Sequence, residues 1–131
     1  MAAEYTVVKR KFNDKDGNTQ EKFYAMAHVN EIIKTKQVAN SIQRSSSLNS
    51  ADVYGVLCAL SEVLATQLRQ GNSVKLDGIG TFSLSLTSKP STNSKNVPHK
   101  SVKVSRICFK AERNLSREIR DLSVAKAKTS L

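Results

Sequence analysis

The sequence contains no tryptophan and few other aromatic side chains, with three tyrosines and four phenylalanines among 131 residues. A core must therefore consist mainly of Val, Leu, Ile and Ala. A chain of this length buries roughly two thirds of its unfolded surface, so folding requires neither a disulfide nor a metal. The two cysteines, Cys58 and Cys108, lie in apolar runs. This favours reduced thiols in or near the core and a reducing cytoplasm.

Catalytic and metal-binding motifs are also lacking. The two histidines, His28 and His99, have no CxxC or HExxH spacing near them, and neither GxSxG nor a P-loop occurs. The segment 77–80 has two glycines but joins two predicted strands, so it is not a dinucleotide loop. We expect no enzyme, metal, cofactor or small-molecule substrate. No signal peptide is evident and no apolar run approaches the roughly 20 residues that span a bilayer, so we expect no membrane association.

Acidic residues are scarce, with 11 Asp and Glu against 21 Lys and Arg, which gives a net charge of +10. The imbalance is local. Residues 72–110 carry seven Lys or Arg side chains and only Asp77 as an acid, whereas the rest of the chain is nearly balanced. A solvated surface would scatter its lysines along the whole chain. A one-sided segment favours a polyanionic partner.

Turn formers and capping residues divide the chain into elements. Residues 4–12 and 21–29 are rich in Tyr, Phe, Val and Thr and flank a turn-forming run, which predicts a β-hairpin. A short helix is predicted over 35–44, and a long helix runs from a cap at Asn49 to Gly71. The remaining elements are expected in this order: strands 73–76 and 81–86, a polar linker 87–98, a strand 101–109 with Val102, Val104 and Arg106 on one face, a helix 112–124 and a frayed end.

The long helix has an unusually broad apolar stripe. Its apolar side chains recur at helical spacing and cover much of the circumference. A chain this small offers too little of its own surface to cover them, which indicates a second subunit. The stripe consists of Val53, Val56, Leu57, Leu60, Val63, Leu64 and Leu68.

Two motifs stand within this order of elements. Residues 74–82 read VKLDGIGTF, and residues 109–115 read FKAERNL. Together they resemble the HU/IHF family of bacterial DNA-bending proteins, in particular longer HU-like members with an N-terminal extension. The resemblance covers residues 31 to about 124. It implies an α+β fold and an intertwined homodimer, with a two-helix base, an antiparallel saddle sheet, a C-terminal helix and, here, an additional N-terminal β-hairpin.

The resemblance also implies positions for the DNA-binding residues. Phe82 and Phe109 would lie in the dimer core. The family's arm tip, Arg-Asn-Pro, is absent, and Pro90 and Pro98 are the candidates for a wedge between base steps. Glu112 stands where the family has glycine and places a negative charge beside the phosphates. The expected DNA-binding residues are Lys75, Lys103, Arg106, Lys110 and Arg113 on or beside the saddle, with Lys89, Lys95 and Lys100 on the arm.

We therefore expect a non-enzymatic, nucleoid-associated protein of the bacterial cytoplasm. It would bind double-stranded DNA with low sequence specificity, as a homodimer, and help to condense it. The expected domains are a hairpin extension (1–30), an HU-like DNA-binding domain (31–124) and a flexible tail (125–131). The alternative is a structural or protein-interaction module on the same scaffold, with the hairpin offering a strand edge to a partner. A single-strand or RNA binder ranks third, because the basic strands lack exposed aromatics.

Overall fold

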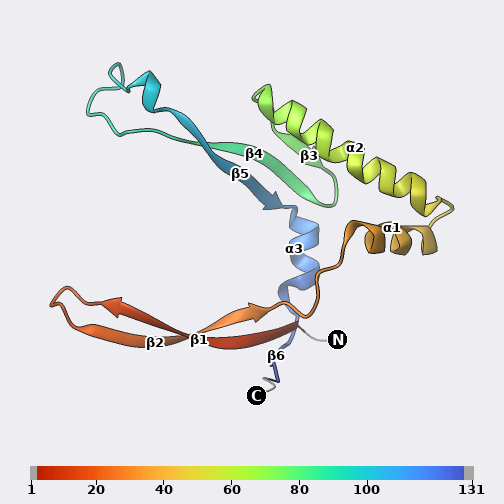
Figure 1. The fold of residues 1–131 in the computed structure, drawn as a ribbon, viewed down its shortest axis with the longest axis horizontal. Helices are drawn as coiled ribbons and strands as arrows, with labels where there is room; N and C mark the ends of the chain where they lie inside the picture. Colours follow the sequence, from red (N-terminus) through yellow and green to blue (C-terminus); the bar gives the residue numbers. More distant parts are fainter. Residues whose placement is uncertain (1–2, 129–131) are drawn as a thin grey trace. The chain divides into compact units, whose positions relative to one another are not determined.

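A computed structural model describes residues 3–128 (Figure 1). These residues form two compact units. The first consists of residues 3–33 and 118–128, and the second consists of residues 34–117. Three α-helices and two three-stranded sheets make up the described part of the chain. The predicted α+β class is confirmed.

The first unit is built on a long hairpin. Strands β1 (Ala3–Asn13) and β2 (Thr19–His28) pair antiparallel from Glu4↔His28 to Asn13↔Thr19, as the turn-forming run between them predicts. On the other edge of β1 lies a short parallel strand, β6 (Val124–Lys126). The amide of Ala127 donates to the carbonyl oxygen of Tyr5 at 2.9 Å.

The strand β6 corrects the expected fraying of the chain end. Over residues 125–127 the backbone is paired with β1, and Ala127 is buried. The pairing joins residues more than a hundred positions apart, and Val-Ala-Lys is too short for a periodic pattern. Residues 129–131 of the expected tail lie outside the described part of the chain.

The second unit begins with two helices joined by a serine-rich turn. Helix α1 (Thr35–Arg44) packs against helix α2 (Ser50–Arg69), and both have the predicted bounds within one or two residues. The Asn49 side chain caps α2 by accepting the amide of Ala51 at 2.9 Å. At the other end Gly71 takes a positive φ of 81°, the conformation that commonly ends a helix.

A second sheet follows, with the strand order β3-β4-β5. Its strands are β3 (Val74–Leu76), β4 (Gly80–Thr87) and β5 (Lys103–Ala111), and α2 contacts β3 and β4. Between β4 and β5 the backbone is irregular apart from the 3-10 turn His99–Ser101. Helix α3 (Arg113–Arg120) is shorter than the predicted helix over 112–124, because residues 121–123 are not helical and residues 124–126 form β6.

Gly80 lies tightly against β5. Its φ is 156°, and a Cβ atom there would overlap with the carbonyl oxygen of Lys110 and lie 2.7 Å from Cε2 of Phe109. We therefore expect Gly80→Ala to lower the free energy of unfolding by about 3 kcal/mol, measured by chemical denaturation. Gly55→Ala is the control, because a Cβ in that helical position meets nothing within 4 Å. Equal stability of the two variants would contradict the prediction.

Little of the described chain is buried. Only Ala39, Val53, Leu68 and Ala127 are buried hydrophobic residues, whereas most of the large apolar side chains of α2, β4 and β5 retain substantial exposure. By length and composition alone α2 could also cross a membrane, and 11% of its most apolar 18-residue window is buried. Asp52 and Glu62 interrupt its apolar residues, so it contains no continuous apolar run of about 20 residues. The core helix of a soluble protein would pass the same test.

Candidate nucleic-acid interface

The β3-β4-β5 sheet has two chemically different faces. Residues paired across antiparallel strands share a face, and successive residues alternate between faces. The pairs Phe82↔Phe109 and Leu84↔Ile107 therefore lie on one face, which α2 partly covers. Lys75↔Thr81↔Lys110 and Ser85↔Arg106 lie on the other. We call this second face the basic face; its charged residues are Lys75, Lys103, Arg106 and Lys110.

An irregularity in β5 completes this separation. Ser85 pairs with Arg106 but Leu86 pairs with Val104, so Ser105 has no partner and forms a β-bulge. The bulge shifts the alternation by one residue. Arg106 consequently joins the basic face while Val104 joins the apolar face. The expectation that Val104 and Arg106 share a face is wrong for this reason.

The basic face carries uncompensated positive charge. All four of its cationic side chains are exposed. Salt bridges within the described residues occur only in the hairpin, where Glu21 pairs with Lys9 at 2.9 Å and with Lys11 at 3.9 Å. Four unpaired cations on one face together produce a positive electrostatic field, which attracts a polyanion.

Glu112 has a structural role that the sequence did not indicate. Its carboxylate accepts a hydrogen bond from the amide of Gly78, and its own amide donates to the carbonyl oxygen of Ile79 at 3.0 Å. Both bonds tie the β3–β4 turn to the start of α3. The half-buried carboxylate is therefore engaged by the backbone and does not stand free beside the basic face.

The remaining predicted residues lie beyond the sheet. Lys89, Lys95 and Lys100 are exposed in the segment 88–102, which also contains Pro90 and Pro98. This segment is closed at its base by a hydrogen bond from the amide of Lys89 to Oγ of Ser101 at 3.2 Å, and Oγ of Ser101 donates to the carbonyl oxygen of Pro98 at 2.7 Å. Neither proline takes a cis peptide bond.

Helix α3 carries cations that the sequence reasoning missed. Arg113, its first residue, was predicted, but Arg117 and Arg120 follow it at i+4 and i+7 and lie on the same stripe. All three are exposed. The helical spacing was visible in the sequence and could have identified them.

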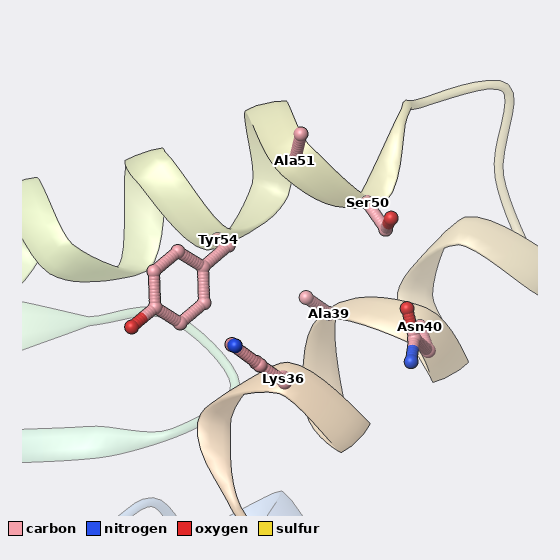
Figure 2. Close-up of a pocket in the computed structure, with 6 residues that line it drawn as sticks. All are labelled: Lys36, Ala39, Asn40, Ser50, Ala51 and Tyr54. Atoms are coloured by element: carbon pink, nitrogen blue, oxygen red, sulfur yellow. The ribbon is translucent and has the colours of Figure 1, made fainter.

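A pocket of about 330 Å³ opens between α1 and α2, and Figure 2 shows Lys36 and Tyr54 reaching into it from opposite helices. Its other lining residues are Ala39, Asn40, Ser50 and Ala51. No cluster of His, Cys, Asp and Glu suited to a metal ion occurs among residues 3–128. Cys108 is half-buried, but Cys58, expected in or near the core, is exposed in the single chain.

Comparisons with known proteins agree with this arrangement. The chain matches the HU-HIG family, described as an HU domain fused to a wHTH, Ig or glycine-rich motif, over residues 1–126. It resembles the crystal structure of a protein from Bacteroides vulgatus ATCC 8482 that is provisionally assigned as a bacterial DNA-binding protein. The TM-score is 0.63 at 12% identity over 99% of this chain, which spans about half (51%) of that protein.

A DNA cocrystal of Anabaena HU matches with a TM-score of 0.49 at 19% identity, over 67% of this chain and 97% of that protein. No curated protein matches the chain. The family match extends over nearly the whole chain, including the hairpin and β6. The chain belongs to the HU-HIG family of HU-like proteins.

Proposed function

We propose that the chain is a non-enzymatic, architectural protein that binds double-stranded DNA through its basic face. The observation that carries this proposal is the separation of the β3-β4-β5 sheet into an apolar face and a face with four unpaired cations. Lys89, Lys95 and Lys100 on the arm segment, with Arg113 on α3, would extend the contact along the duplex. The domain division into 1–30, 31–124 and 125–131 remains a prediction.

The binding unit is proposed to be a homodimer. Leu86, Val104 and Ile107 on the apolar face are each 61% exposed, and α2 leaves much of its stripe uncovered. Burial of apolar surface contributes about 25 cal/mol per Å², so leaving such a face in water forfeits much of the available stabilisation. A second copy with the same unfinished face would cover it. Phe82 and Phe109, whose ring centroids lie 4.9 Å apart, would belong to that shared core.

Recognition would depend on shape and backbone, not on base edges. Lysine and arginine neutralise phosphates and release condensed counterions, which carries no sequence information. Helix α2 is too apolar to lie exposed in a major groove. Pro90 or Pro98 could wedge between base steps and bend the duplex. Such a protein suits a bacterial nucleoid, where it would help to condense DNA.

The proposal is tested by titrating labelled duplex DNA at several salt concentrations. If each subunit places four cations on phosphates, a dimer makes about eight contacts, and the log–log slope of affinity against salt should be roughly −7. Fluorescence anisotropy measures this slope directly. A flat salt response, or no binding at low salt, would contradict DNA binding and favour the protein-interaction module instead.

A further inference from the structure

The hairpin, like the sheet of the second unit, has two unlike faces. The register Val8↔Tyr24, Arg10↔Lys22 and Phe12↔Gln20 places these residues on one face. The register Val7↔Ala25, Lys9↔Phe23 and Lys11↔Glu21 places these six residues on the opposite face. We call the first the aromatic face; it comprises Val8, Arg10, Phe12, Gln20, Lys22, Tyr24 and Met26.

Charge is divided unequally between these faces. On the opposite face, Glu21 pairs with both Lys9 and Lys11, so much of that charge is compensated. Arg10 and Lys22 on the aromatic face form no ion pair within the described residues. An acid stands at each end of this face. Glu4 lies opposite His28, and the carboxylate of Asp14 accepts from the side-chain amide of Gln20 at 3.5 Å and from the backbone amide of Lys15 at 2.6 Å.

The aromatic side chains of this face are accessible and lie beside its cations. The rings of Phe12 and Tyr24 meet edge to face, with centroids 6.0 Å apart and an angle of 73°. The guanidinium of Arg10 lies over the Tyr24 ring, 6.0 Å from its centroid, and Nη2 of Arg10 donates to Sδ of Met26 at 3.9 Å. Phe12, Tyr24 and Met26 are 42%, 41% and 45% exposed.

We propose that the aromatic face binds single-stranded nucleic acid. Accessible rings interleaved with unpaired cations match a ligand with flat bases and a charged backbone: each ring can stack on a base while Arg10 and Lys22 neutralise phosphates. A second copy of the same face would add another Arg10 and Lys22, which form no ion pair within the described residues. Charge therefore favours an anionic strand over self-association. This site is separate from the duplex-binding basic face and does not depend on it.

The test compares aromatic substitutions on the two faces of the same hairpin. The probes are labelled 12-nucleotide oligo(dT) and oligo(U), which separate DNA from RNA as the source of the strand, titrated against the full chain at low salt. Phe12→Ala/Tyr24→Ala should weaken binding about tenfold or more, since each stacked base contributes substantially. Phe23→Ala is the matched control, because Phe23 is more exposed but lies on the opposite face. It should change binding less than about twofold.

Further variants separate stacking from folding. Tyr24→Phe retains the ring and should retain binding, and Phe12→Leu/Tyr24→Leu retains apolar volume but should still lose it. Equal losses in the Phe23 and Phe12/Tyr24 variants, or normal binding by the leucine variant with an unchanged circular dichroism spectrum, would overturn the proposal. So would a poly-glutamate peptide that binds as tightly as the oligonucleotides and loses affinity in the same variants, because it would indicate an acidic protein partner. Duplex titration of the same variants reports independently on the basic face.

Discussion

Replacing Lys75, Arg106 and Lys110 together with glutamine should weaken duplex binding by about a thousandfold at low salt. All three side chains lie on the basic face, exposed and without an acidic partner among the described residues. In a dimer the change removes six cations. Each phosphate contact contributes about 0.9 to the log–log salt slope, so the slope should fall in magnitude by about 5.

The control is a triple glutamine variant with the same loss of charge elsewhere. Lys9, Lys11 and Lys15 lie on the hairpin, and two of them are already paired with Glu21. If net charge alone attracts DNA, both triple variants should weaken binding alike. If the basic face is the interface, the hairpin variant should retain most of its affinity and salt slope. Equal loss in the two variants, measured by anisotropy with the same duplex, would contradict the proposed site.

Substituting Val56 and Val63 on α2 with glutamate should dissociate the proposed dimer, weakening association at least a hundredfold. The two valines are 66% and 51% exposed in the single chain, where a carboxylate would meet water at little cost. Within a dimer interface each carboxylate would be buried without a partner, which costs several kcal/mol. Because a single chain buries so little apolar surface, loss of the partner should also unfold it.

Sedimentation equilibrium and circular dichroism together measure this outcome. Glu62→Lys is the control, because Glu62 lies on the side of α2 away from Val53 and Leu64 and already carries a charge. It should leave both association and helix content nearly unchanged. A wild-type chain that sediments as a monomer at micromolar concentration would contradict the dimer outright, as would a stable dimer of the double glutamate variant.

Local patterns in the sequence were sufficient to predict most of the elements. The hairpin follows from its turn-forming run, α2 from the Asn49 cap and its apolar spacing, and the β3–β4 pair from the glycine turn. These signals act within a few residues of one another. The charge pattern singled out the segment 72–110, and the family resemblance implied which of its cations belong to the saddle, before the register placed them on one surface.

Features that depend on distant pairing could not be predicted. The parallel contact of β6 with β1 and the hydrogen bond from Gly78 to Glu112 each join segments that no periodic pattern connects. The segregation of Arg10 and Tyr24 from Glu21 depends on the hairpin register, which the turn geometry fixes. Phe12 and Tyr24 come together on one face only through this register, so the sequence alone did not predict that face.

The bulge at Ser105 constrains how this protein can vary in length. On the outer side of the bulge Lys103 pairs with Thr87, and on the inner side Arg106 pairs with Ser85, so both cations reach one surface only because a single unpaired residue stands between them. Loss of Ser105 would reverse the two faces of the outer part of β5. Lys103 would then lie on the apolar face and Val104 on the basic face. Within β5, an insertion or deletion therefore keeps the two faces unchanged only if it involves an even number of residues. Length changes in the irregular segment 88–102 do not shift this alternation, so they change the length of the segment without changing which side chains share the basic face.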